Sequence, residues 1–309
     1  MAKKVSIIGA GNVGASLAQR LYNGGITDIV LVDVIEGLPQ GKALDISQTA
    51  NFLKTNLQIS GTNDYKDTAG SDIIVITAGI SRKPGMTRDQ LLATNMKIVA
   101  DATRKSAGYS HGCIIIVITN PVDAMTYLSL KVSGFTRQRV FGLSGALDGA
   151  RLASFIADEM DISAGNVTPF VIGEHGGSMV VVPRLTMVDG KPLTKLLSSE
   201  KVNRLSKRTV NGGAEIVSYL KTGSAFYAPA ASAAQMVEAV LGDNKEIINC
   251  SAYLNGEYGL KDIAIGVPVR LGKNGIEEVI ELELNAGERQ AFLSSADAIR
   301  KTINKLDIA

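Results

Sequence analysis

Residues 5–14 of the chain read Val-Ser-Ile-Ile-Gly-Ala-Gly-Asn-Val-Gly, and this stretch decides the fold of the first half. A β-branched run ends in Gly9, and a helical pattern follows at residues 15–22. In such a strand–turn–helix unit, the first glycine makes the tight turn, the second lets the backbone approach a pyrophosphate, and the third lets helix and strand pack closely. The sequence therefore predicts a dinucleotide site, with its phosphates at the helix N-terminus, formed by Gly9, Gly11, Asn12, Val13 and Gly14.

A second β-branched run, residues 29–33, ends in Asp33, 19 residues after Gly14. A carboxylate at this place can accept both ribose hydroxyls of a dinucleotide and repels a 2′-phosphate. The next three residues are Val-Ile-Glu, with no arginine to bind such a phosphate. The sequence therefore favours NAD over NADP, and the alternative is that Asp33 only caps the next element.

Strands and helices are expected to alternate along the first half, and that alternation predicts a doubly wound α/β domain with a parallel sheet. Runs such as Ile-Ile-Ile-Val-Ile at residues 114–118 are apolar without alternation, as in strands covered on both faces. The expected strands are residues 5–9, 29–33, 57–61, 73–78 and 114–119. The expected helices are residues 15–22, 41–52, 88–107 and 123–133.

After residue 142 the pattern changes to an α+β mixture, so we expect a Rossmann domain at residues 1–142 and a substrate domain at residues 143–309. Asp189-Gly190 is expected to form a hairpin turn. The expected helices are residues 147–160, 202–221, 230–241 and 286–306, and the expected strands are residues 167–172, 180–188, 247–254 and 263–271.

Composition narrows the classes of protein and of partner. A chain of 309 residues with 45% hydrophobic residues is long enough for a sizeable core in one large or two medium domains. Its apolar runs are shorter than the roughly 18 residues of a membrane helix, and its first residues lack the pattern of a secretion signal. With a net charge of +2 and no basic block, neither a nucleic acid nor a membrane is expected as a partner.

The cysteines, the histidines and the missing motifs exclude several kinds of site. The two cysteines, Cys113 and Cys250, lie in separate apolar segments, which excludes a disulfide scaffold and favours a cytoplasmic location. The chain has two histidines and lacks both C-x-x-C and H-E-x-x-H, so no metal site is expected. The P-loop motif and the G-x-S-x-G nucleophile elbow are also missing.

One histidine, His175, lies among glycines after a β-branched run, in Val-Ile-Gly-Glu-His-Gly-Gly at residues 171–177. These glycines allow a ligand to come close and the chain to take an unusual path. Histidine is suited to accept the proton when an alcohol is oxidised near neutral pH. A lone histidine is more often structural, and we keep that interpretation for His111 in the polar loop at residues 108–112.

Asp148 and Arg151 open a helical pattern and lie three residues apart, so they share one helix face. A carboxylate paired with His175 would fix the tautomer of the imidazole and stabilise its protonated form. A guanidinium on the same face can hold a substrate carboxylate with two parallel hydrogen bonds. The alternative is an ordinary surface ion pair.

Residues 78–88 follow the fourth expected strand and include three cations, with Pro and Gly that predict a loop. The loop lies at the carboxyl end of a parallel strand, where such sheets bind ligands. Arg82 and Arg88 bracket its bend, so both can face an anion, and closing the loop would expel water. A solvated charge run is the alternative. Asn120 ends another expected strand and can donate a hydrogen bond to substrate or cofactor.

Together these residues resemble the lactate/malate dehydrogenase superfamily over nearly the whole chain. Within it, the chain is most similar to the bacterial malate dehydrogenases whose overall sequence is lactate-dehydrogenase-like. Besides the glycine loop, the resemblance rests on Arg82-Lys83-Pro84-Gly85-Met86-Thr87-Arg88, Thr119-Asn120-Pro121-Val122-Asp123, Leu147-Asp148-x-Ala150-Arg151 and Gly173-Glu174-His175-Gly176. It implies NAD-dependent oxidation of (S)-malate to oxaloacetate, a step of the tricarboxylic acid cycle, by a homodimer or homotetramer.

The resemblance also implies a role for each matching residue. His175 takes the hydroxyl proton while hydride moves to NAD, and Asp148 orients and charges that histidine. Arg151 binds the carboxylate next to the reacting carbon. Arg88 polarises the carbonyl, and Arg82 stands where lactate enzymes typically carry Gln, so it matches a second carboxylate. The implied contacts with NAD include Asn95, Ile118 and Asn120, the last of which also touches substrate.

Elementary electrostatics support the interpretation of Arg82, because a diacid buried without a second cation would leave an unpaired charge. The chain departs from the family at two places: Gly177 stands where Asp usually follows the His-Gly pair, and Glu174 is more typical of the lactate branch. Three alternatives remain open: a lactate or other 2-hydroxyacid dehydrogenase, an NAD-dependent glycosidase of the same fold, and a non-catalytic NAD-sensing module.

Overall fold

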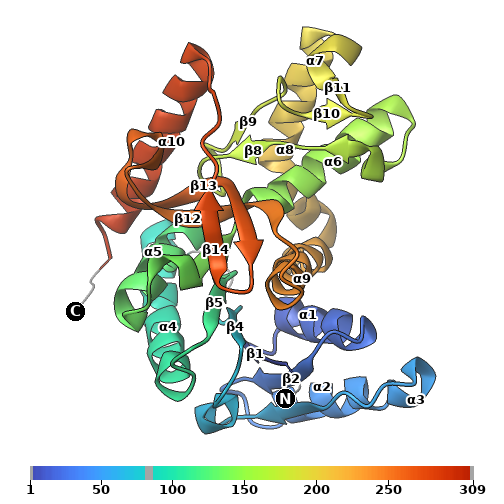
Figure 1. Ribbon diagram of the computed structural model, residues 1–309, viewed down its shortest axis with the longest axis vertical. Helices are drawn as coiled ribbons and strands as arrows, with labels where there is room; N and C mark the ends of the chain where they lie inside the picture. Colours follow the sequence, from blue (N-terminus) through green and yellow to red (C-terminus); the bar gives the residue numbers. More distant parts are fainter. Residues whose placement is uncertain (1–2, 81–85, 307–309) are drawn as a thin grey trace.

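A nine-stranded sheet runs through both halves of the molecule (Figure 1). The computed structural model describes residues 3–80 and 86–306, except for the side chain of Arg88. Six parallel strands follow the order β6-β5-β4-β1-β2-β3, which is the order of a dinucleotide-binding fold. They are β1 (Lys4–Ile8), β2 (Asp28–Val32), β3 (Ile59–Thr62), β4 (Ile73–Ile76), β5 (Ile114–Val117) and β6 (Val140–Leu143).

Both faces of the parallel sheet are buried, because its strands carry apolar residues at successive positions. Along β1, Val5 and Ile7 join one core cluster and Ile8 joins the other. Helices α1 and α2 pack on the first cluster, whereas α4 and α5 pack on the second, so the predicted doubly wound domain is confirmed. The helices of this half are α1 (Asn12–Asn23), α2 (Leu38–Ser47), α3 (Ala50–Leu53), α4 (Arg88–Tyr109) and α5 (Val122–Ser133), with 3-10 turns η1 (Tyr65–Thr68) and η2 (Arg137–Arg139).

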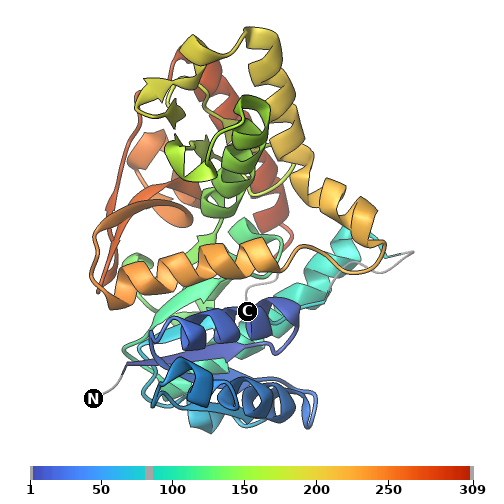
Figure 2. The same cartoon turned by 90° about the vertical axis from the view of Figure 1, so that its right-hand side faces the viewer.

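The second half extends the same sheet with three antiparallel strands beside β6: β12 (Glu246–Asn255), β13 (Lys261–Gly272) and β14 (Gly275–Val279). Its helices are α6 (Gly145–Met160), α7 (Leu193–Leu196), α8 (Ser199–Leu220), α9 (Tyr227–Leu241) and α10 (Ala286–Ile303), with 3-10 turns η3 (Ala164–Asn166) and η4 (Glu257–Gly259). Figure 2 shows α9 running between the two halves, above α1, which it contacts. The predicted α+β half is confirmed.

Two small antiparallel sheets complete the second half: β11-β10-β7 and β8-β9. Their strands are β7 (Val167–Thr168), β8 (Val171–Ile172), β9 (Val180–Val181), β10 (Met187–Val188) and β11 (Lys191–Pro192). The predicted Asp189-Gly190 hairpin joins β10 to β11, and both turn residues have positive φ, 46° and 74°. This confirms the turn, because a type I′ turn needs positive φ at both positions.

Several expected elements differ from the structure for physical reasons. The expected strands 167–172 and 180–188 are each broken, because Pro169 and Pro183 provide no N–H for a sheet. The expected helix at residues 41–52 is two helices, α2 and α3. Strands β6 and β14 were not expected. In β6, Gly142 interrupts the β-branched pattern, yet a Cβ there would lie 2.2 Å from the Thr126 hydroxyl of α5, so close packing requires the glycine.

In the described ranges, no helix combines the length and the apolar character that crossing a bilayer requires.

Candidate active site

The glycine loop after β1 has the geometry that the sequence predicts. Gly9 has a φ of +109°, and a Cβ there would lie 2.7 Å from the Ala78 amide nitrogen of the neighbouring segment. A Cβ at Gly14 would lie 1.9 Å from the Gly9 carbonyl oxygen, so helix α1 can approach the loop only with glycine there. A Cβ at Gly11 would meet no atom within 4 Å, and this leaves open space beside the first turn of α1.

Asp33 follows β2 and joins the ends of the first two strands. Its Oδ2 accepts a hydrogen bond of 2.6 Å from the Ala10 amide, and its Oδ1 accepts one of 3.0 Å from the Ile35 amide. The carboxylate therefore does stabilise the local turn, as the capping interpretation expects. A carboxylate has about four lone pairs, so it retains acceptor capacity for ribose hydroxyls.

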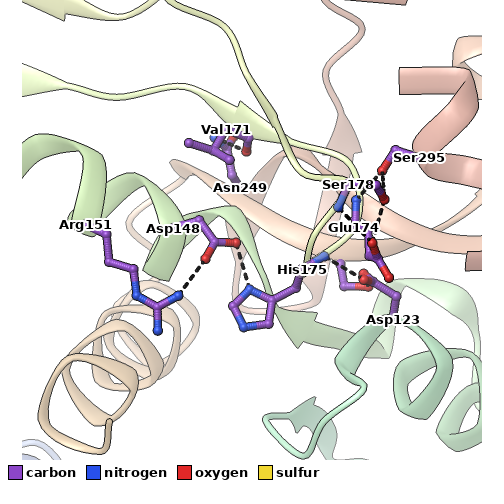
Figure 3. A network of polar contacts seen from close by, with 10 residues as sticks. Asp123, Asp148, Arg151, Val171, Glu174, His175, Ser178, Asn249 and Ser295 are labelled. Carbon is purple, nitrogen blue, oxygen red and sulfur yellow. Dashed lines mark hydrogen bonds and ion pairs between the residues drawn. The ribbon is translucent and has the colours of Figure 1, made fainter. Parts of the chain in front are cut away.

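His175, Asp148 and Arg151 form one chain of polar contacts, with Asp148 in the middle (Figure 3). The Nδ1 atom of His175 lies 2.7 Å from Asp148 Oδ2, and Arg151 donates to Asp148 Oδ1 over 3.1 Å. Asp148 is almost completely buried at 1% exposed, whereas the His175 and Arg151 side chains keep 12% and 13% of their surface. The surface ion-pair interpretation of Asp148 and Arg151 is therefore wrong, because α6 turns the pair inward.

The surroundings of His175 favour its protonated form. Burial alone would lower the pKa of the imidazole, but the charge and hydrogen bond of Asp148, together with the charge of Asp123, outweigh burial and raise that pKa above its usual 6.5. With Nδ1 engaged by Asp148, Nε2 is the ring nitrogen left for a substrate. The arrangement can accept a proton from an alcohol and stabilise the resulting imidazolium.

Three further contacts hold the histidine loop, and sequence reasoning did not find them. Asp123, at the start of α5, accepts from the His175 amide over 2.8 Å. Glu174 donates through its amide to Ser295 of α10 over 2.7 Å, and its carboxylate accepts from the Ser178 hydroxyl over 2.5 Å. Ser178 is four residues after Glu174, but Asp123 and Ser295 lie far from the loop in sequence, so no spacing rule connects them to it. Asp123 does lie within the quoted motif after Asn-Pro-Val.

A cavity of about 410 Å³ lies between the histidine loop and the dinucleotide side of the molecule. It is lined by His175 and Arg151 of the substrate side and by Val13, Ile118 and Asn120 of the dinucleotide side. Sequence reasoning missed the wall that α8 and the segment between α8 and α9 provide, which includes Val210, Gly213, Ala214, Val217, Ser224 and Ala225. The cavity can therefore hold a small molecule between the histidine and a bound dinucleotide.

Asn95 is not among the residues that line this cavity. Asn95 is buried, at 2% exposed, and its Oδ1 accepts from the Ile80 amide over 2.8 Å. Its Nδ2 donates to the Asn120 carbonyl over 2.9 Å, so it joins two segments beside the cavity. Arg82 lies outside the described residues. Arg88 begins α4, and its side chain lies outside the description.

Two family models match the chain in succession. The lactate/malate dehydrogenase NAD binding domain matches residues 3–142, and the lactate/malate dehydrogenase alpha/beta C-terminal domain matches residues 145–307. The chain belongs to the lactate/malate dehydrogenase family. Because its first domain is the NAD-binding domain of these dehydrogenases, the predicted family and the predicted cofactor NAD are both confirmed.

Individual members of the lactate/malate dehydrogenase family match over nearly full length. Malate dehydrogenases of Dehalococcoides mccartyi and Heliobacterium modesticaldum are 57% and 54% identical to this chain, and each alignment covers at least 97% of both proteins. The solved structure of Salinibacter ruber malate dehydrogenase is 44% identical, with a TM-score of 0.94, and covers 98% of this chain and 97% of its own. A Cryptosporidium parvum lactate dehydrogenase, solved with lactic acid and NAD, is 37% identical, with a TM-score of 0.96. The alignment covers 100% of this chain and 99% of the lactate dehydrogenase chain.

The residues of the glycine loop fit NAD. The open space at Gly11 and the free N–H groups at the start of α1 suit a pyrophosphate, and Asp33 lies at the end of the next strand. Val13 and Ile118 give the shared cavity an apolar wall on the dinucleotide side.

Proposed function

We propose that this chain catalyses the reversible, NAD-dependent oxidation of (S)-malate to oxaloacetate. The observation that carries the proposal is the buried Asp148–His175 pair, which faces a cavity shared with Arg151 and the dinucleotide side. The high identity to proteins named malate dehydrogenase supports malate as the substrate. In this proposal, residues 1–142 bind the cofactor and contribute Arg82, Arg88 and Asn120 to the substrate site, and residues 143–309 form the catalytic domain.

The proton transfer follows from the geometry of His175. In malate oxidation, neutral Nε2 takes the proton of the C2 hydroxyl, and Asp148 stabilises the imidazolium that forms. When bound, NAD supplies the acceptor for the hydride that leaves C2. Arg151 binds the C1 carboxylate with the part of its guanidinium that does not face Asp148, and the Asn120 amide orients the C2 oxygen.

The proposal gives the two loop arginines separate roles. Arg88 polarises the carbonyl of oxaloacetate, and Arg82 pairs with the C4 carboxylate. A site that offers a buried guanidinium to a methyl group leaves that charge unpaired, so it discriminates strongly against pyruvate. Selectivity for the four-carbon diacid would therefore depend on Arg82.

The proposed setting is a cytoplasmic homodimer or homotetramer. Cys113 and Cys250 are both buried and free, and burial raises the pKa of the Cys113 thiol to about 12, so neither is poised for disulfide chemistry. The oligomer rests on the likeness to the family.

Steady-state kinetics at the NADH absorbance band test the substrate assignment. Wild-type enzyme should reduce oxaloacetate far better than pyruvate, and Arg82→Gln should lower oxaloacetate turnover by at least about a hundredfold while sparing pyruvate. A lactate dehydrogenase is the second candidate, because a lactate enzyme has almost the same fold, with a TM-score of 0.96 against 0.97 for two malate enzymes. Unchanged oxaloacetate turnover in Arg82→Gln, or better turnover of pyruvate by wild type, would favour that candidate.

A further inference from the structure

Asp123 lies at the meeting point of three separate elements. It is the second residue of α5 and is 4% exposed. Its Oδ2 accepts from the His175 amide over 2.8 Å, and its Oδ1 accepts from the Ser251 hydroxyl of β12 over 2.6 Å. One carboxylate thus connects α5, the antiparallel part of the sheet and the histidine loop (Figure 3).

The structure assigns to Asp123 the role of a positioning residue, which holds the main chain of His175 while Asp148 holds its ring. This inference rests on the proposed function, in which His175 exchanges a proton with substrate. The ring contact constrains only Nδ1, so it leaves the peptide before the histidine free to tilt within the limits of one contact inside the loop, from the Gly176 amide to the Glu174 carbonyl over 2.9 Å. The second contact removes that freedom, and small misplacements of a catalytic group are costly in rate.

The charge of Asp123 adds to its geometric role. Both of its hydrogen-bond donors are neutral, and the charged groups that face it are Glu174 on the same loop and His175, with Asp148 beyond the imidazole. An asparagine could still bond to both partners, with Oδ1 accepting from the His175 amide and Nδ2 donating to the Ser251 hydroxyl, so a carboxylate is not needed for geometry alone. Asp123 also favours the protonated form of His175 by its charge, which supports the imidazolium from a second side.

Four substitutions separate charge from geometry. Asp123→Asn removes the charge and keeps both hydrogen bonds, whereas Asp123→Ala removes all three. Ser251→Ala keeps the charge but releases one side of the carboxylate. Asp262→Asn is the matched control, because Asp262 also binds α5, accepting from Tyr127 over 3.0 Å and from Lys131 over 2.8 Å, without touching the histidine loop.

Two measurements on the full-length protein read out the two effects. Imidazole NMR titration is simple here, since the chain has two histidines and His111→Gln assigns the signals. The titration of His175 should move to lower pH in Asp123→Asn and stay in place in Asp262→Asn. For oxaloacetate reduction, Asp123→Ala should lose at least about tenfold in kcat/KM, and Ser251→Ala about threefold, with the KM for NADH unchanged.

The proposal is overturned if Asp123→Asn and Asp123→Ala match the Asp262→Asn control in both His175 titration and kcat/KM. If Asp123→Ala does not fold, Asp123→Asn and Ser251→Ala decide by the same comparison. A wild-type protein that fails to reduce oxaloacetate would refute the proposed function instead, and the NMR titration would still decide the role of Asp123.

Discussion

The glycine loop at residues 9–14 and the histidine loop at residues 173–178 differ in what holds them. The first takes its shape from its own backbone: Gly14 packs on the Gly9 carbonyl, and β1 leads directly into α1. Side chains of Asp33, Lys42 and Thr77 also bind the backbone of its first two residues. The second follows β8, a strand of two residues, and is held by side chains 27 to 121 positions away in sequence.

This difference separates the tasks of the two loops. A phosphate site can be made from backbone N–H groups, so local geometry is enough. A proton-transfer site must fix one imidazole to within a fraction of an ångström, which requires support from several elements. The cofactor half should therefore respond to changes within the loop, and the catalytic half to changes far from it in sequence.

The largest expected effect comes from removing the imidazole itself. His175→Asn should lower kcat for oxaloacetate reduction by about three to four orders of magnitude, because no other group can move the proton. NADH affinity, measured by fluorescence titration, should remain within about threefold of wild type. His111→Asn is the control, since His111 is exposed in another loop, and a similar loss there would contradict the assignment.

Two glycines of the other loop allow a matched test of local geometry. Gly14→Ala should lower the free energy of unfolding by about 3–4 kcal/mol, because its Cβ would meet the Gly9 carbonyl oxygen at 1.9 Å. Gly11→Ala should cost within about 1 kcal/mol, yet weaken NAD binding about tenfold by occupying space that a pyrophosphate needs. Thermal unfolding measures the stability of each variant, and calorimetric titration measures its affinity for NAD. Equal losses of stability in Gly14→Ala and Gly11→Ala would contradict the assigned packing role of Gly14.

The same difference explains what could be predicted from the sequence. Gly9 and Gly14 belong to one strand–turn–helix unit and Asp33 follows the next strand, so motif spacing predicted their geometry. The parallel sheet was predicted from the apolar strands. His175 and Asp148 were predicted from residue chemistry and from the resemblance, and their 2.7 Å contact supports the pairing.

The remaining supports of the histidine loop could not be predicted, because nothing in the sequence states which distant segments meet. Ser295 of α10 accepts from the Glu174 amide of the loop, whereas Ser251 of β12 acts through Asp123. Both are brought into place by the packing of the antiparallel strands and α10 against α5. Pro169 and Pro183 could have warned that the flanking strands are short. The inward turn of Arg151 depends on α8, where Gly212 and Gly213 leave room for its guanidinium.

Asp123 should also make the free energy of unfolding depend on pH, and this effect is smaller than those above. Burial raises the pKa of its carboxyl to about 6, from an ordinary 3.8, although hydrogen bonds from Ser251 and His175 oppose the rise. When the pKa of a group is higher in the folded protein than in the unfolded chain, the group stabilises the fold at low pH, where it is protonated. That stabilisation is complete below the pKa of the unfolded chain and is lost as the pH rises through the pKa of the folded protein. Wild type should therefore lose stability between pH 4 and pH 7 through this group.

Asp123→Asn should not show this loss. Relative to the variant, wild-type unfolding free energy should fall by about 2–3 kcal/mol from pH 4 to pH 7, since each pKa unit corresponds to about 1.4 kcal/mol. Calorimetry at fixed protein concentration measures the difference. A constant gap between the two proteins across this range would mean that Asp123 has the same pKa folded and unfolded.

The smallest expected effect tests whether the outer contacts of the histidine loop matter less than the two aspartates. Glu174→Ala should lower the free energy of unfolding by about 1 kcal/mol, because Ser178 loses its acceptor, and kcat should change by about threefold or less, because Asp148 and Asp123 still hold His175. Glu174→Gln is the control, since an amide oxygen can still accept from Ser178. If Glu174→Ala reduces kcat as much as Asp123→Ala does, all the contacts of the histidine loop matter equally for catalysis. The contacts to the ring and main chain of His175 would then be no more important than the contact between Glu174 and Ser178.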